Sequence, residues 1–262
     1  MPHADLANVR LHYEIEGPEG APVLVFSHSI GASTVMWDAV LPYFSGRFRV
    51  LRYDTRGHGA SSVPPGPYSI AELGNDALEL LDALGIQRCI FCGLSMGGMI
   101  GMWLGIHAPE RIERLILANT GARIGTTKLW NDRIESVQRG GVAAIAELIL
   151  ERWFTIRFRQ AAPETIAAVH RMIVGTSTEG YVNCCAAIRD EDLTESLHLI
   201  HADSLVLTGT EDPATPPSDG RIIEEKIPNA AYVELATSHL SAIEDPGGFS
   251  GAVLGFLSHP EA

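Results

Sequence analysis

A single serine lies where the chain could present a nucleophile. Ser95 is the centre of GLSMG, which fits the pattern G-x-S-x-G between the apolar run CIFC and the helix-like run GMIGMWLGIHAPE. A serine at such a strand-to-helix turn exposes its hydroxyl, and small flanking residues avoid a collision within the turn. Ordinary packing glycines would give the same bare pattern. The strand before it and the helix after it nevertheless favour a nucleophile.

The serine hydroxyl is a weak nucleophile at neutral pH, so it needs a general base and an acid that orients the base. We expect His239 to be the base, because it follows a predicted strand in ELATSH and a loop can return its ring to the strand ends. Asp212 in LVLTGTEDPATPP is the expected acid, and it gives the chain order Ser, Asp, His. Glu211 is its immediate competitor, and Asp54 of YDTRGHG is assigned to loop structure with Arg56.

Five other histidines are less suited to the role of base. His3, His12 and His259 lie near the termini or in early strands, and His107 and His170 lie in helical segments. For each of them we expect an ordinary place on the surface or in the core.

Acyl transfer also needs hydrogen-bond donors for the developing oxyanion. The residue after the nucleophile supplies one, the N–H of Met96, and the HSIG loop after the first apolar run can supply the second, the N–H of Ile30. His28 and Ser29 either shape this loop or touch a ligand. For His28, a hydrogen bond to the backbone is at least as good an interpretation.

Short apolar runs that end in loops alternate with runs of helical spacing, which predicts a mainly parallel sheet with helices on both faces. Between residues 122 and 198 the strand pattern disappears and the segments look helical. We therefore expect an α/β core formed by 1–121 and 199–262, with a helical cap at 122–198. The strand-like runs are 22–31, 48–59, 89–98, 114–121, 203–212 and 230–239, and the helix-like runs include 36–44, 70–85, 140–154 and 164–175.

Composition narrows the class of protein. The chain has 262 residues, 46% of them hydrophobic and 19% charged, which supports a packed globular protein. Its net charge of −13 disfavours nucleic-acid binding, because such a protein repels phosphate. No signal peptide or membrane-spanning run is visible, so we expect a cytoplasmic protein without a membrane partner. The four cysteines lack the pattern of a disulfide framework and are expected to be buried thiols.

With these residues in place, the sequence resembles the α/β-hydrolases that carry a helical cap, and more narrowly the 3-oxoadipate enol-lactonases of the β-ketoadipate pathway. The resemblance extends over almost the whole chain. Its core motifs are shared by many hydrolases, whereas the two cap segments WNDRI and GYVNCCAAIRDED are more specific. The other matching stretches are SIGASTVMWD, FRVLRYDTRGHGASSVPPGPYSI, GLSMGGMIGMWLGIHAPERI and GTEDPATPP.

The resemblance implies a mechanism that needs neither a cofactor nor a metal. Ser95, deprotonated by His239, would attack the lactone carbonyl, and the amides of Met96 and Ile30 would bind the oxyanion. Ring opening expels an enolate, and water activated by His239 then releases the acyl group as 3-oxoadipate.

The implied substrate is a small lactone with a carboxylate, which an acidic protein repels unless a local cation offsets the field. Residues 122–198 hold nine Lys and Arg against ten Asp and Glu, so the cap is nearly neutral. Arg133 and Arg189 are the candidates for the cation, with Trp130 as an apolar wall and Trp153 as a weaker choice. The competing interpretation is a set of surface ion pairs of little energy. Those pairs would be Arg189 with Asp190 or Asp192, and Arg133 with Asp132 or Glu135.

Other activities remain open at this point. The same Ser, Asp and His would serve a carboxylesterase, a perhydrolase or a hydrolase of carbon–carbon bonds, because fold and triad do not fix the substrate. Haloalkane dehalogenases and many epoxide hydrolases use Asp at the elbow, so Ser95 argues against them. From another class, a small-molecule receptor on a hydrolase scaffold would also fit. The sequence leaves the oligomeric state open, including a homo-oligomer.

Overall fold

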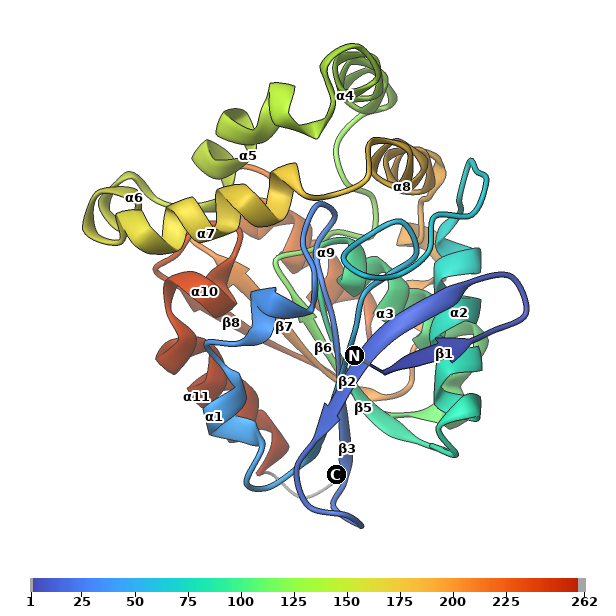
Figure 1. The fold of residues 1–262 in the computed structure, drawn as a ribbon. Coiled ribbons are helices and arrows are strands. Elements are labelled where there is room, and N and C mark those ends of the chain that lie inside the picture. The colour runs from blue at the N-terminus through green and yellow to red at the C-terminus, as the bar shows by residue number, and fades with distance from the viewer. Residues whose placement is uncertain (1, 259–262) are drawn as a thin grey trace.

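The computed structural model describes residues 2–258, and their strands form one mainly parallel sheet (Figure 1). Its strand order is β1-β2-β4-β3-β5-β6-β7-β8. β1 and β2 run antiparallel to their neighbours, and every later pairing is parallel. The strands are β1 (His3–Asp5), β2 (Arg10–Glu16), β3 (Val23–Ser27), β4 (Arg49–Tyr53), β5 (Cys89–Leu94), β6 (Ile112–Ala118), β7 (Asp203–Gly209) and β8 (Ala230–Leu235).

Helices cover both faces of the sheet, with α2 on one side and α1 and α11 on the other (Figure 1). α2 begins with a capping box in which Ser69 and Glu72 bond each other's backbone N–H groups, and Gly85 follows its end at φ +70°. The core helices are α1 (Leu41–Phe44), α2 (Ile70–Ala83), α3 (Met96–His107), α9 (Pro217–Lys226), α10 (Ser241–Glu244) and α11 (Pro246–Leu257), with short 3-10 helices at Thr34–Trp37, Pro109–Arg111 and Thr194–Leu199. The predicted α/β fold class is confirmed.

One predicted helix is wrong in its continuity. The run 36–44 was expected to form one helix, but it splits into the 3-10 turn Thr34–Trp37 and the short α1. Pro42 in the first turn of α1 explains the break, because proline has no N–H to donate to the carbonyl four residues earlier.

Five helices fill the segment between β6 and β7, and no strand occurs there within residues 122–198. Figure 1 shows them together over one end of the sheet. We use the word cap for residues 122–198, the boundaries expected from the sequence. The cap helices are α4 (Thr127–Gly140), α5 (Ala146–Trp153), α6 (Ile156–Ala161), α7 (Pro163–Val174) and α8 (Thr178–Asp190), with a 3-10 turn at Val142–Ile145.

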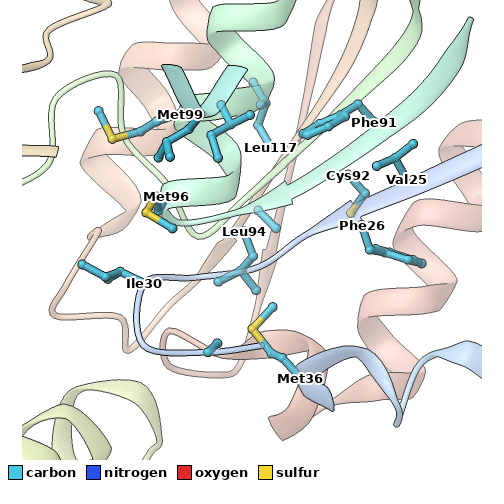
Figure 2. Close-up of a cluster of buried hydrophobic side chains, with 14 of the residues drawn as sticks. Val25, Phe26, Ile30, Met36, Phe91, Cys92, Leu94, Met96, Met99 and Leu117 are labelled. Carbon is cyan, nitrogen blue, oxygen red and sulfur yellow. The ribbon is translucent and has the colours of Figure 1, made fainter. Parts of the chain in front are cut away.

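The core lies between the central strands and the helices that cover them. Side chains from β3, β5 and the start of α3, including Phe26, Cys92 and Met99, form the buried cluster of Figure 2. Burying this apolar surface is the main source of stability for the edge that carries the site. All four cysteines are free and buried, as expected from the sequence. No helix within residues 2–258 is long and apolar enough to cross a membrane.

Parallel pairing determines which residues meet. Ser27 is opposite Gly93, and Ala118 is opposite Leu207, so β3, β5, β6 and β7 end at a common edge. The loops that leave this edge carry the candidate catalytic residues. A crevice outside the carboxyl ends of the strands is the usual ligand site in open α/β sheets.

Candidate active site

Ser95 occupies a strained turn between β5 and α3. Its φ of +58° and ψ of −116° are rare for a residue with a side chain. The turn leaves no room for a side chain at Gly93 or at Gly97, the two glycines of the motif. A Cβ on Gly93 would lie 2.0 Å from the Gly97 carbonyl oxygen, and one on Gly97 would lie 2.1 Å from the Ser27 carbonyl oxygen. Both glycines of the motif are therefore steric requirements of a sharply presented serine.

His239 and Asp212 form a buried hydrogen-bonded pair. His239 Nδ1 donates to Asp212 Oδ2 over 2.8 Å. The amides of Ala214 and Thr215 donate to Asp212 Oδ1, and the Thr215 hydroxyl donates to Oδ2. Burial alone would raise the pKa of Asp212, but the charge of His239 and these hydrogen bonds hold it below its usual value. Asp212 thus stays ionised and orients an imidazole whose Nε2 can accept a proton.

Ser95 and His239 line the same pocket. No hydrogen bond joins their side chains within the described part of the chain. Catalytic hydrogen bonds are often loose before substrate binds, so the two residues keep their expected roles as predictions.

Asn119 is a residue that the sequence interpretation missed. It follows β6 with φ +43°, and its Nδ2 donates to Asp212 Oδ2 and to the Ser238 carbonyl, both over 3.1 Å. The Ser241 hydroxyl in turn donates to its Oδ1. Asn119 therefore ties the loop of Asp212 to the loop of His239. The sequence feature that could have identified Asn119 is its position as a polar residue directly after a predicted parallel strand.

The two expected oxyanion donors are free to bind a ligand. Figure 2 shows Ile30 on the loop after β3 and Met96 at the start of α3. Within residues 2–258, neither backbone N–H donates a hydrogen bond to a protein atom. Ile30 also lines the pocket with Ser95. This arrangement suits an oxyanion hole, which needs donors left without an internal acceptor.

Two buried histidines hold the loop that carries the Ile30 amide. His28 Nδ1 donates to the Ser29 carbonyl over 2.8 Å and its Nε2 accepts from the Thr55 N–H, so the backbone-bonding interpretation of His28 is the one observed. The Ser29 carbonyl and the Ile30 N–H belong to one peptide group. His28 therefore fixes the direction of that donor.

His58 holds the other side of the same loop. Its Nε2 accepts from the Gly31 N–H over 2.9 Å, and its Nδ1 donates to the Arg56 carbonyl. This pattern requires a neutral ring. Burial and the neighbouring His28 lower the pKa of His58 to about 3. The loop thus keeps its hydrogen bonds unchanged over the neutral pH range.

His58 gives a prediction about stability and pH. The unfolded His58 binds a proton near pH 6.5, whereas the folded ring stays neutral down to about pH 3, so folding loses stability as pH falls through this window. The His58→Gln variant lacks this contribution to the pH dependence of the unfolding free energy. We expect the drop in unfolding free energy between pH 7 and pH 5 to be smaller than in wild type by about 2 kcal/mol. Urea unfolding at both pH values measures it, and an unchanged pH dependence would contradict the neutral buried ring.

Asp54 holds the loop that follows β4, as the assignment to loop structure anticipates, and Arg56 is bonded separately. Asp54 accepts from His12, from the Thr34 N–H and from the Ala60 N–H. Arg56 donates twice to Asp76, each over 2.6 Å, because α2 brings this carboxylate to face the guanidinium fork.

The remaining histidines among the described residues do not line the pocket. His12 is buried against Asp54, and His3, His107 and His170 lie outside the pocket walls. His259 lies outside the described residues. Glu211 is exposed and pairs with Arg157, so Asp212 is the carboxylate that meets His239.

The cap closes over Ser95 with a mixture of aromatic and cationic side chains. The Trp153 ring faces the His239 ring, with an interplanar angle of 29° and centroids 6.4 Å apart. The Trp130 indole donates to the Ile124 carbonyl, and the Arg133 guanidinium lies 4.9 Å from its ring centroid. The aromatic and cationic cap residues that line the pocket are Trp130, Arg133, Arg152 and Trp153.

The two predicted arginines differ in their surroundings. Arg189 is not among the pocket walls; it forks onto Asp190 at 2.7 Å and reaches Asn131, which is the surface pairing considered as its alternative. The proposed partners of Arg133 are engaged elsewhere, Asp132 by Lys128 and Glu135 by Arg139. Within residues 2–258, Arg133 makes no ion pair with a carboxylate. Arg152, which was not predicted from the sequence, is the second arginine that lines the pocket.

No group of three or more His, Cys, Asp or Glu side chains is arranged to hold a metal ion in the described residues. The chemistry available in the pocket is that of a strained serine, an oriented imidazole and two free amides. These groups can perform acyl transfer on an ester or a lactone.

A serine elbow after a parallel strand, with an acid and a base on later loops, defines the α/β-hydrolase architecture. The family described as alpha/beta hydrolase fold matches residues 22–246, and the chain belongs to this family. Within it, the resemblance to 3-oxoadipate enol-lactonases is confirmed by curated relatives from Acinetobacter baylyi. 3-oxoadipate enol-lactonase 2 is 42% identical and 3-oxoadipate enol-lactonase 1 is 36% identical, each over 94% of this chain and 92% of its own.

A solved structure agrees with these relatives. The enol-lactonase from Burkholderia xenovorans LB400 superimposes with a TM-score of 0.97 at 42% sequence identity. The match covers 98% of this chain and 100% of the other. The similarity therefore extends through the cap as well as the core.

Proposed function

We propose that the protein hydrolyses 3-oxoadipate enol-lactone to 3-oxoadipate through an acyl-enzyme on Ser95. One observation carries the proposal: the pocket that holds Ser95 and His239 is also lined by Arg133, which has no carboxylate partner in residues 2–258, within a chain of net charge −13. A reacting ring and a carboxylate would both be accommodated there. The names of the relatives support the same substrate.

The first half of the reaction forms the acyl-enzyme. His239 Nε2 takes the proton of Ser95 as its Oγ attacks the lactone carbonyl, and the Ile30 and Met96 amides stabilise the oxyanion. Collapse breaks the bond between the acyl carbon and the ring oxygen. That oxygen leaves as an enolate, a better leaving group than an alkoxide, and accepts the proton from His239.

The second half releases the product. His239 deprotonates a water molecule, whose oxygen attacks the acyl carbon, and Ser95 leaves with the proton returned from His239. The new carboxylate departs, and the enol becomes the ketone of 3-oxoadipate. Asp212 remains ionised throughout and stabilises the imidazolium in both halves. The chain's own residues supply every proton transfer, so the proposal requires no cofactor.

The cap supplies substrate recognition in this proposal. A planar guanidinium suits a carboxylate, and the Trp130 ring under Arg133 keeps its side chain in place. Trp153 provides an apolar wall beside His239. Arg189 is committed to Asp190 and is not needed. We further propose a cytoplasmic location, which the four free buried thiols favour because disulfides are rare in reducing compartments.

Arg133→Met tests the substrate class. Loss of a charge-assisted hydrogen bond is expected to raise KM for the enol-lactone by about 10- to 100-fold, and KM for a neutral p-nitrophenyl ester by less than about threefold. Steady-state kinetics on both substrates measures the difference. Arg139→Met is the matched control, because Arg139 is an exposed cap arginine paired with Glu135. Equal effects on both substrates would favour a general carboxylesterase.

A further inference from the structure

Arg152 is held in a fixed place beside the catalytic base. The Ser238 hydroxyl donates to the Arg152 carbonyl over 2.8 Å, and the Leu240 N–H donates to the Trp153 carbonyl over 3.1 Å. The end of α5 is thus bonded to the residues on both sides of His239. These bonds fix the backbone of Arg152 relative to the reacting centre, so its side chain starts from a set position beside His239.

The guanidinium of Arg152 is incompletely satisfied. One terminal nitrogen, Nη2, donates to the Pro213 carbonyl over 3.0 Å, while Nε is buried and has no partner in the described residues. It makes no ion pair with a carboxylate within residues 2–258. Burial of this cation is unfavourable and the charge of Asp212 offsets the cost only in part, so an anion in the pocket would offset more of it.

Arg152 and Arg133 meet where an inner pocket joins an outer groove. The inner pocket, with a cavity volume of about 40 Å³, contains Ser95 and His239. The outer groove between α4 and α5 has a volume of about 390 Å³ and includes Lys128. Leu129, Arg133 and Arg152 line both, and we call these three residues the neck. Burial and the charge of Arg133 lower the pKa of Arg152, whereas the charge of Asp212 acts in the opposite direction.

We propose that Arg152 is a specificity-determining residue that binds the substrate carboxylate together with Arg133 at the neck. The inner cavity is small, so a reacting ring that reaches Ser95 fills it and directs its acidic arm outward to the neck. Two guanidinium groups there provide more donors than one carboxylate needs, which favours a shared, forked contact. This inference deepens the proposed function and rests on it for the identity of the substrate.

The alternative is that Arg152 only braces the loop of Asp212 through Pro213. A brace would affect every substrate alike, whereas an anion site affects only charged ones. The experiment therefore compares two esters of matched length, p-nitrophenyl pentanoate and the mono-p-nitrophenyl ester of glutaric acid. The enzymes are wild type, Arg152→Met, Arg152→Lys and the control Arg139→Met.

Arg152→Met is expected to lower kcat/KM for the glutarate ester by about 10- to 100-fold and for the pentanoate ester by less than about threefold. Lysine keeps the charge but not the fork, so Arg152→Lys should recover part of the loss. Free glutarate should inhibit hydrolysis of the pentanoate ester, with a Ki that rises in both Arg152 variants. Should Arg152→Met fail to fold, Arg152→Lys and the Ki values still decide the question.

Equal losses on both esters, or an unchanged Ki for glutarate, would overturn the anion site in favour of the brace. The result is separable from the proposed function. A wild-type enzyme that prefers the glutarate ester through Arg152, yet leaves the enol-lactone intact, would support the anion site and refute the lactone as substrate.

Discussion

Ser95→Ala is expected to lower kcat for the enol-lactone by about 10⁴-fold or more, because loss of the nucleophile removes the acyl-enzyme route entirely. The fold should survive. Within residues 2–258 the hydroxyl makes no hydrogen bond to another residue, and alanine keeps the Cβ that already occupies the turn at φ +58°. Steady-state kinetics measures the activity, and urea unfolding confirms that the variant is folded.

A matched control is available for this substitution. Ser250 of α11 is buried, and its hydroxyl has no partner in the described residues, yet it lies outside the pocket. Ser250→Ala should therefore keep kcat within about twofold, because a surface or core change outside the site leaves chemistry intact. A Ser95→Ala enzyme with activity within tenfold of the control would place the nucleophile elsewhere.

Asp212→Asn is expected to lower kcat by about 10³- to 10⁴-fold with little change in overall structure. Oδ1 would still accept from Ala214 and Thr215, which leaves the new amide nitrogen in the place of Oδ2. That nitrogen would then face donors on Asn119 and His239. The imidazole would turn to the tautomer with its proton on Nε2 and could no longer accept the proton of Ser95.

The pH dependence separates this effect from simple misfolding. If orientation and charge are lost, activity at high pH should rise only where hydroxide assists the serine, while urea unfolding should still show a cooperative transition from a folded state, at a lower unfolding free energy than in wild type. Kinetics across pH 6 to about 9 measures this dependence. Activity within tenfold of wild type at neutral pH would show that Asp212 is not the orienting acid.

Much of the core was predictable because local patterns determine it. The alternation of apolar runs with helical runs indicates a parallel sheet, and parallel strands must end at one edge. Ser95 and the two glycines of its motif were also predictable, because all three belong to one short local pattern. The prediction of one helix over 36–44 was wrong because it relied on the spacing of apolar residues and not on Pro42. Proline has no N–H to donate, and the segment therefore divides into a 3-10 turn and a short helix.

The residues that were missed depend on contacts between distant segments. Asn119 meets Asp212 and Ser238 only after β6 and β7 pair. Arg152 looked like any charged residue of an amphipathic helix until α5 was placed against the loop of His239. From the sequence alone, Arg133 and Arg189 were equally good candidates for the cation that binds the substrate carboxylate. The fold distinguishes them, since one lines the pocket and the other forks onto its neighbour Asp190.

The central claim is a serine hydrolase whose cap selects a carboxylate-bearing lactone. The most direct test is kcat/KM of the purified protein for 3-oxoadipate enol-lactone and for its methyl ester, with Ser95→Ala in parallel. We expect rapid, Ser95-dependent opening of the acid form and a methyl ester that is poorer by about 100-fold, the value of a lost charge-assisted contact. Opening no faster than with Ser95→Ala, or equal rates for acid and ester, would contradict the account.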